Sequence, residues 1–457
     1  MKKKLFSLAI GMTLGIFATA TAQNTNSGYF LDGYNYRYQL NPSFGNSMNF
    51  ISIPAIGNVN FAMRGNLRLQ DVVHIVDGKS VLFTNPDVSS SFLNDMSLMN
   101  SLGLDLKLNL LSGGFKAWGG YNTVSINARA QMHVGVPKAL FELAKEGVSN
   151  RDYDLSGMNA SAQAFAEIAF NHSRDIKQVP GLRVGGAVKF LLGMANLDAR
   201  FNKAYLTLDK NDWKAVTDAE VNANLGGFRY KTEINDNGVQ YVSGADTKGE
   251  GSIGVNGFGM SFDLGANYQW RDFNFSLAIL DLGWITYSNT QQASTNGRKS
   301  FNTDAYIFNA DENADNSFKN EWKNFTKNLD KLYQLTDNGN VGDYSVMPGT
   351  TLNIGIDYAL PYYRRLHFGL LSSTRIVSDF TWTEARISAN VNPVDCFSAD
   401  VNVAFSTFAT SFGWMLNFNH RWFNIFAGMD HTLGKISKEG IPLNSNASFN
   451  FGINIPF

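Results

Sequence analysis

Cysteine is almost absent from this sequence: Cys396 is the only one, so the chain cannot form an intramolecular disulfide. The six histidines show no H-E-x-x-H motif and no paired spacing of metal ligands. Neither a G-x-S-x-G element nor a phosphate-binding glycine loop occurs. These gaps argue against a metal centre and against an enzyme, and we expect no cofactor.

Long hydrophobic runs and charge of either sign are also scarce. No segment approaches the roughly 18 consecutive apolar residues of a membrane-spanning helix. Charged residues make up 17% of the chain and the formal net charge is −1, so nothing predicts a nucleic-acid partner. Aromatic residues, at 13%, and glycine, at 42 of 457 positions, are plentiful instead.

The first 22 residues have the features of a secretory signal peptide. Lys2, Lys3 and Lys4 precede a short apolar stretch, and Ala20-Thr21-Ala22 forms an A-x-A cleavage site. We therefore expect cleavage before Gln23 and export from the cytoplasm. Because the residue after the site is not cysteine, a lipoprotein anchor is not expected.

The last eleven residues, A-S-F-N-F-G-I-N-I-P-F, alternate between apolar and small or polar residues. A period of two places all apolar side chains on one face of a strand, and about 9–11 residues suffice to cross a bilayer when tilted. An amphipathic strand of a soluble sheet would show the same alternation. The terminal aromatic resembles the signal that barrel-assembly machinery reads in outer-membrane proteins. We expect that signal to consist of Phe449, Phe451, Ile453, Ile455 and Phe457.

Similar alternation recurs along the whole mature chain, in strands of about 10–14 residues against about 5–6 in soluble sheets. Long connections such as 229–256 and 288–349 fall on one side and short turns on the other, as in bacterial barrels. The sequence therefore predicts an all-β outer-membrane barrel over residues 58–457, with outer-membrane lipid as a partner. Counting with a tight external turn near 195 and a periplasmic turn at 209–213 gives about sixteen antiparallel strands, and fourteen remain possible.

Two external loops carry helical patterns. Pro137 precedes K-A-L-F-E-L-A-K-E, which Gly147 closes, and Ser317–Leu335 has apolar residues at helical spacing. On the strands, six charged residues are predicted to face the lumen, where charges usually pair across strands. These are Asp105, Lys107, Arg129, Asp263, Glu384 and Arg386.

Residues 23–57, ahead of the first barrel strand, are rich in tyrosine and asparagine and poorly periodic. A barrel of this size has a lumen that must be filled or wet, so this segment is predicted to form a small plug. Asn41 can close a turn before Pro42, whose fixed φ sets a bend, and Phe44 then points an aromatic ring into the barrel.

Several short stretches carry a family resemblance: N-P-S-F at 41–44, S-I-P-A at 52–55, V-P-G-L-R-V-G-G-A-V-K-F-L-L-G at 179–193, D-L-G-W at 281–284, M-P-G-T-T-L-N-I-G at 347–355 and G-M-D-H at 428–431. Together they resemble the FadL-like superfamily of long-chain fatty-acid transporters, whose Bacteroidota branches include PorV-like barrels. The nearest resemblance is to an uncharacterised branch, and Ser43 departs from the N-P-A motif.

The resemblance implies passive transport or binding of a small hydrophobic molecule. The alternative is a PorV-like scaffold that assists secretion machinery or surface proteins.

Overall fold

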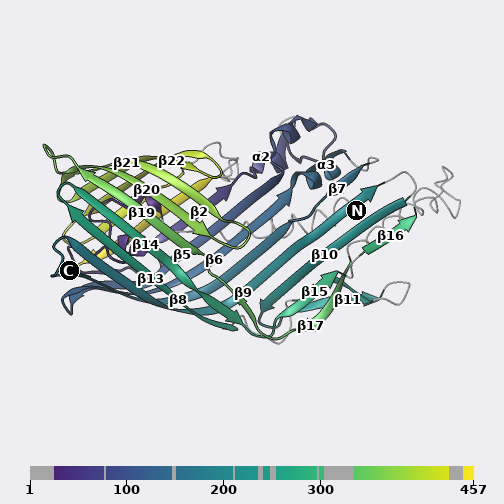
Figure 1. The fold of residues 1–457 in the computed structure, drawn as a ribbon, viewed down its shortest axis with the longest axis horizontal. Helices are drawn as coiled ribbons and strands as arrows, with labels where there is room; N and C mark the ends of the chain where they lie inside the picture. Colours follow the sequence, from purple (N-terminus) through teal and green to yellow (C-terminus); the bar gives the residue numbers. More distant parts are fainter. Residues whose placement is uncertain are drawn as a thin grey trace.

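The structure, a computed structural model, describes residues 25–76, 79–146, 151–208, 212–234, 240–246, 254–295, 298–302, 334–431 and 446–457. Within this part of the chain, fourteen antiparallel strands close a ring (Figure 1). In ring order they are β2 (Val59–Gly65), β5 (Met99–Ala117), β6 (Gly120–Pro137), β8 (Asn159–Asp175), β9 (Leu182–Leu208), β13 (Gly257–Trp270), β14 (Phe273–Tyr287), β19 (Thr350–Ala359), β20 (Leu366–Ile376), β21 (Trp382–Val394), β22 (Phe397–Ser406), β23 (Thr410–Asn419), β24 (Asn424–Met429) and β25 (Ala447–Pro456). The predicted all-β barrel is confirmed.

The first and last strands close the ring. β2 pairs with β25 from Val59 opposite Phe451 to Met63 opposite Ala447, and β25 pairs with β24 on its other side. Closure leaves the ring without an open edge, which is the condition for a sheet in contact with lipid. No helix of the described residues is long and apolar enough to span a membrane.

The ring has fourteen strands, the lower end of the predicted range of fourteen to sixteen, and the two extra strands of the higher count were placed around β9. No turn interrupts β9 near residue 195: the strand runs for 27 residues, and Gly193 lies opposite Gly257 of β13, with only a register shift against β8 that skips Met194. The N-terminal half of β9 pairs with β13 up to Gly193, and its C-terminal half pairs with β10 (Asp212–Leu225) from Ala195 onward. β10 and β13 therefore stand end to end beside one long strand, and β10 lies outside the ring.

The turn predicted at 209–213 is misplaced for the same reason. Residues 209–211 lie outside the described part, but the flanking strands bring Leu208 opposite Trp213. The predicted turn therefore lies at the end of β9 that is opposite the short turn at 176–181. We call this end of the barrel the loop end. The other end, with short connections such as Arg271–Asp272, is called the short-turn end.

A wall of strands continues the barrel beyond the ring on one side of the loop end (Figure 1). β15 (Gln291–Thr295) and β16 (Arg298–Asn302) pair with β10, and β17 (Leu335–Asn340) pairs with β15. β7 (Asp152–Asp154) pairs with the C-terminal end of β9, and β18 (Tyr344–Val346) pairs with the C-terminal end of β14. β11 (Arg229–Ile234) and β12 (Gln240–Asp246) form a separate hairpin.

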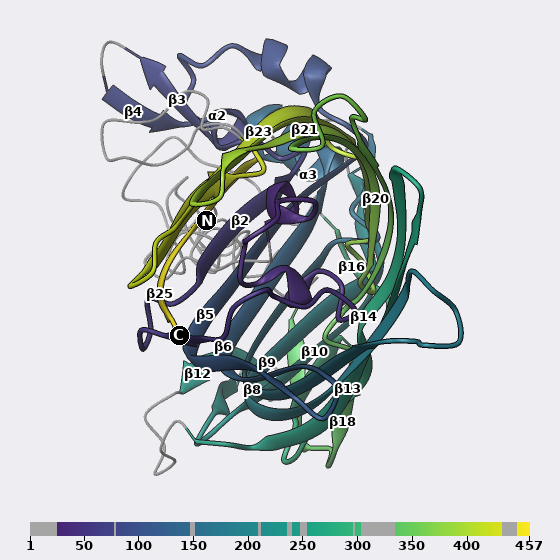
Figure 2. The ribbon, with the colours of Figure 1, turned by 90° about the vertical axis from the view of Figure 1, so that its left-hand side faces the viewer.

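A second group of elements packs on the outside of the barrel near the loop end (Figure 2). It comprises α2 (Leu69–Val72), β3 (Val73–Val76), β4 (Lys79–Leu82), η3 (Ser90–Asp95) and α3 (Lys138–Glu146). Phe83, Leu93 and Phe141 of this group pack against Leu102 and Leu104 of β5 in one apolar cluster. The helix predicted after Pro137 is thus present as α3, whereas most of the segment Ser317–Leu335 falls in 303–333, outside the described residues.

The two faces of the ring strands differ as the alternation predicts. On β21, Thr383, Ala385 and Ile387 are exposed on the outer face, while Glu384 and Arg386 between them are buried inside. Large apolar side chains such as Leu264, 59% exposed, recur on the outside of the ring. A soluble protein would not leave so many of them in contact with water, so this exterior matches a lipid environment.

Candidate functional site

The N-terminal segment lies inside the barrel (Figure 2). Residues 25–49, which we call the plug segment, contain the short 3-10 turns η1 (Asn26–Gly28) and η2 (Arg37–Gln39) and are mostly buried. The chain then joins the wall through β1 (Phe50–Ser52), which pairs with both β25 and β5. The wall therefore begins before residue 58, where the sequence placed its boundary.

The Asn-Pro-Ser turn of the plug segment is held against bare backbone of the wall. Asn41 Oδ1 accepts hydrogen bonds from the backbone N–H and the hydroxyl of Ser43, at 2.9 and 2.7 Å. Asn41 Nδ2 donates to the carbonyl oxygen of Leu277 at 3.3 Å. A Cβ atom on Gly265 would lie 2.1 Å from Asn41 Oδ1, and one on Gly185 would lie 2.1 Å from the oxygen of Pro42. Glycine at both positions is what allows this close approach.

An aromatic cluster fills the lumen around this turn. The Phe44 ring packs edge-on against Tyr29 at 5.3 Å and lies under the guanidinium of Arg37 at 4.5 Å. Burial also raises the pKa of the Tyr38 phenol to about 12, because the phenolate would lose its hydration. The full cluster consists of Tyr29, Phe30, Leu31, Tyr34, Tyr36, Tyr38, Leu40, Phe44 and Phe50 with the wall residues Leu371, Met415 and Phe426.

The first turn of the plug segment is bound by one carboxylate, which we call the Asp430 latch. Asp430 Oδ2 accepts from the backbone N–H of Asn26 at 2.8 Å. Asp430 Oδ1 accepts from the backbone N–H and the hydroxyl of Ser27, at 2.7 and 2.8 Å. Arg64 and Arg386 lie 3.3 and 3.6 Å from the same carboxylate and balance its charge. Asp430 itself is 1% exposed.

A second charged group, the β5–β14 network, lines the opposite wall. Its members are Lys107, Arg129, Glu167, Lys189, Asp263 and Asp281. Arg129 makes two parallel hydrogen bonds to Asp281, each 2.9 Å, and a third of 2.7 Å to Glu167. Lys189 Nζ lies 2.6 Å from both Asp263 and Asp281. Three cations face three carboxylates, so the buried charges compensate one another.

The predicted lumen-facing residues are all buried on the inner side, in three places. Lys107, Arg129 and Asp263 belong to the β5–β14 network. Glu384 and Arg386 pair at 2.8 Å beside the Asp430 latch, where Arg386 also bonds to Asn402. Asp105 lies 3.9 Å from Arg375.

Asp430 was not singled out from the sequence, and Asp281 of the D-L-G-W stretch was expected to stabilise a turn or the barrel rim, yet each carboxylate pairs with two buried cations. Asp281 has a φ of 57°, and its backbone N–H donates to Asp263 Oδ1 at 2.7 Å where the β13–β14 register shifts. The resulting bulge turns Asp281 inward and breaks the two-residue alternation. Asp430 follows β24 and belongs to no strand, so periodicity could not reveal it. The G-M-D-H stretch that contains it was the only available signal.

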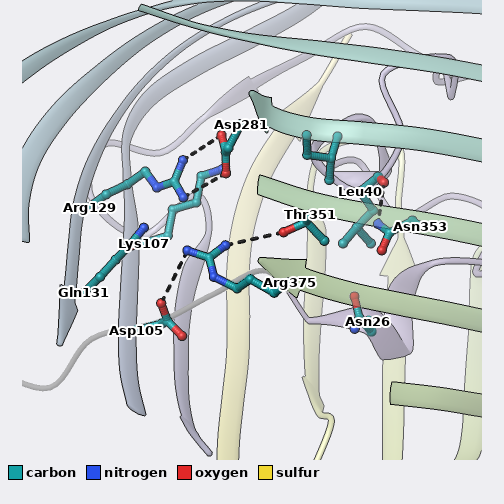
Figure 3. Close-up of a pocket in the computed structure, with 11 residues that line it drawn as sticks. Asn26, Leu40, Asp105, Lys107, Arg129, Gln131, Asp281, Thr351, Asn353 and Arg375 are labelled. Atoms are coloured by element: carbon teal, nitrogen blue, oxygen red, sulfur yellow. Dashed lines mark hydrogen bonds and ion pairs between the residues drawn. The ribbon is translucent and has the colours of Figure 1, made fainter. Parts of the chain in front are cut away.

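A small polar cavity lies between the two walls above the plug segment (Figure 3). Its volume is about 30 Å³, enough for roughly two or three water molecules, since one water needs roughly 10–15 Å³ on this measure. Arg375 reaches across it between Thr351 and Asp105, and Lys107 faces it from β5. Asn26 and Leu40 of the plug segment also line it. The cavity can hold water, but a hydrocarbon of useful size does not fit.

An apolar groove of about 570 Å³ lies on the outer face at the short-turn end. It crosses four neighbouring strands, β8, β9, β13 and β14. Its lining residues are His172, Arg174, Val184, Gly185, Gly186, Leu264, Gly265, Ala266, Leu277 and Ile279. Gly186 and Ala266 leave the depression because their outward positions carry almost no side chain. The Asn-Pro-Ser turn lies directly behind the wall here.

The predicted assembly residues lie on the outer face of β25 or at its end. Phe449, Ile455 and Phe457 are 38%, 46% and 70% exposed, and Phe451 and Ile453 are half-buried. Asn450 and Asn454 between them are fully buried in the lumen. Among the described residues, no group of three or more histidine, cysteine or acidic side chains is arranged to hold a metal ion.

Comparison with other proteins gives one match to a family. The model of a family described as "Family of unknown function (DUF5723)" matches residues 42–430. No curated protein matches the sequence.

Three solved structures are similar in outline. The Pseudomonas putida toluene transporter TodX is 8% identical over 96% of each chain, with a TM-score of 0.41. The Ralstonia pickettii toluene transporter TbuX is 8% identical over 96% of this chain and 95% of its own, with a TM-score of 0.40. A Pseudomonas aeruginosa FadL homologue is 8% identical over 96% of this chain and 99% of its own, with a TM-score of 0.35. At such low values, none of these likenesses bears on what the chain binds.

Proposed function

We propose that this chain, which belongs to the DUF5723 family of unknown function, is an outer-membrane barrel that binds or passively conducts a small hydrophobic molecule. The plug segment closes the barrel, and its displacement opens the path. The protein acts without a cofactor and catalyses no reaction.

The aromatic cluster in the lumen carries this proposal. Lumen positions of a water-filled porin are polar, whereas here twelve apolar or aromatic residues fill the space inside the ring. A hydrophobic guest that replaced part of the plug segment would meet Leu371, Met415 and Phe426 of the wall. Transfer of an apolar molecule from water to such a surface is favourable in proportion to the area buried.

A reversible crosslink tests whether the plug segment gates the barrel. Asn35 Nδ2 of the plug segment donates to Asn424 Oδ1 of β24 at 3.2 Å, so Asn35→Cys with Asn424→Cys, in a Cys396→Ser background, places two thiols together. We expect vesicles containing the oxidised protein to admit an uncharged hydrophobic fluorophore much more slowly than the same vesicles after reduction.

A matched pair in the wall serves as the control. Thr374 and Thr383 are opposite each other on β20 and β21, with their hydroxyl oxygens 3.0 Å apart, and neither touches the plug segment. Thr374→Cys with Thr383→Cys should leave uptake unchanged in both redox states. Equal uptake by the oxidised and reduced plug-locked protein would refute the gating proposal.

The location in the membrane is tested separately. A closed barrel resists detergent until heated, so we expect the mature protein to fractionate with the outer membrane and to change its gel mobility on heating. Recovery as a soluble periplasmic protein would contradict an outer-membrane location, whatever the outcome of the crosslinking experiment.

The wall above the ring favours a second candidate, a scaffold for secretion machinery or surface proteins. β10 and the neighbouring strands β15, β16 and β17 project past the loop end on one side, where a partner could reach them (Figure 1). If this role is correct, a defined partner should co-purify with the full chain and be lost when the β11–β12 hairpin is removed. Partner-free protein that still conducts the fluorophore would favour transport.

A further inference from the structure

We propose that the outer groove over β8, β9, β13 and β14 is a binding site for a phospholipid of the leaflet at the short-turn end. The acyl chain would lie in the groove and the phosphate would bind Arg174. This inference rests on the proposed membrane location and is independent of whether the plug segment gates the lumen.

The shape of the groove follows from the strand register. Arg174, Val184, Ala266 and Leu277 are neighbours across the four strands, and His172, Gly186, Leu264 and Ile279 form the next row. With roughly 4.8 Å between strands, the two rows cover about 14 Å of the wall. A volume of about 570 Å³ is within the roughly 300–1,000 Å³ of small-molecule sites.

Small residues at the centre of the groove distinguish it from the rest of the outer face. One row further along the strands, the outward positions are filled by Phe170, Val188 and Phe262, all at least 38% exposed. At Gly186 and Ala266 the wall instead recedes, while Leu264 and Leu277 project beside them. A lipid chain that filled this depression would supply van der Waals contacts that the small side chains of the wall do not make.

Charge complementarity identifies the head group. Arg174 is exposed at the short-turn side of the groove, and among the described residues no carboxylate forms an ion pair with it. Its neighbour Asp175 lies 3.3 Å from Arg183 instead. Lys177 follows in the adjoining turn, and a hydrogen bond from Gln269 to Gly181 brings the Arg271 turn alongside. Arg174 is thus the cation that lines the groove, and Lys177 and Arg271 lie in the two short turns at the same end of the barrel, where a phosphate would be attracted.

Aromatic side chains place this end of the groove at the edge of the membrane. Tyr268 and Trp270, just beyond the groove on β13, are 39% and 49% exposed. The guanidinium of Arg271 lies 5.2 Å from the centre of the Trp270 ring. Such rings gather where the apolar core of a bilayer meets the head groups. Arg174 is therefore at phosphate level, and the groove extends from there towards the bilayer core.

Native mass spectrometry in detergent, with added phosphatidylglycerol, tests the site. We expect one tightly held lipid on the full chain. Ala266→Phe should reduce its binding at least tenfold by filling the groove, and Arg174→Gln should reduce it roughly fivefold, the usual effect of one cation near a lipid surface. Ala266→Leu repeats the first test with a smaller side chain, should Ala266→Phe fail to show heat-modifiable mobility.

Matched controls exclude general lipid coating. Ala385→Phe adds the same ring to another outward alanine, and Arg421→Gln removes a cation from a different short turn. Both should bind lipid as the unmodified chain does. Equal loss in all variants, or in none, overturns the proposal. Loss with Ala266→Phe but not with Arg174→Gln overturns the phosphate assignment, and a dimer that Ala266→Phe disrupts would assign the groove to a second copy of the chain.

Discussion

Replacing Asp430 by asparagine should release the plug segment while leaving the barrel closed. The carboxylate accepts three hydrogen bonds from Asn26 and Ser27 and balances Arg64 and Arg386. In Asp430→Asn one oxygen becomes an NH₂ group, which faces an N–H donor and cannot accept from it. The two arginines also lose a buried counter-charge.

The expected size of the effect follows from these losses. Removing one partner from a buried, hydrogen-bonded ion pair costs roughly 3–5 kcal/mol. If that cost falls on docking of the plug segment, the undocked population rises by roughly 10²- to several 10³-fold, since about 1.4 kcal/mol corresponds to a factor of ten.

Two measurements report undocking. Single-channel recording in planar bilayers should show frequent openings for Asp430→Asn, and trypsin should cut after Arg37, whose side chain is only 14% exposed in the docked state. Asp263→Asn is the control, because Asp263 is equally buried and ion-paired with Lys189 but forms no hydrogen bond with the plug segment. Unchanged openings together with an intact Arg37 site would refute the latch.

Three further predictions concern the plug segment and the outer face. Gly265→Ala should destabilise the docked plug segment by about 1–3 kcal/mol, because the added Cβ would lie 2.1 Å from Asn41 Oδ1. Gly244→Ala is the control, since no atom lies near its added Cβ. Trypsin should cleave after Arg37 faster in Gly265→Ala than in Gly244→Ala. Phe451→Arg should cost roughly 2–4 kcal/mol in denaturant unfolding from lipid vesicles if it lies near the bilayer midplane, while Tyr362→Arg, on a 99% exposed side chain in a short turn, should cost little. Burial raises the pKa of Tyr38 from 10.0 to about 12. The contribution of the buried, protonated Tyr38 to the stability of the docked plug segment is therefore complete below pH 10 and is lost as the pH rises towards 12. A phenolate absorbance titration of the full chain, compared with that of Tyr38→Phe, should show the raised pKa.

Strand periodicity predicted most of the ring because lipid outside and a polar interior impose the same alternation on every strand. It failed at β9, where an unbroken strand of 27 residues serves the ring with one half and the projecting wall with the other. Local sequence carries no mark of the point where β13 replaces β10 as the neighbour. Which strand pairs with each half of β9 is decided by contacts between distant segments of the chain. For this reason the strand-by-strand count gave sixteen, whereas the ring has fourteen.

Residues outside the alternation were harder to find. Asp281 is inward only because a bulge shifts its strand, and Asp430 acts from a segment without regular structure. Periodicity also places Asn450 in the lumen without revealing its contacts: its side chain is fully buried and donates hydrogen bonds to Asn58 Oδ1 and to the backbone carbonyl oxygen of Val59.

The Asp430 latch also has a consequence for the order of assembly. Asn26 and Asp430 are 404 residues apart in the chain, and the ring closes only when β25 pairs with β2. Contacts of such high sequence separation form late, since a very long loop must first be closed. The plug segment is synthesised first, but its anchoring carboxylate is among the last groups to reach its place. A chain that stalled before β24 would therefore have an unsealed lumen and an N-terminal segment without its latch.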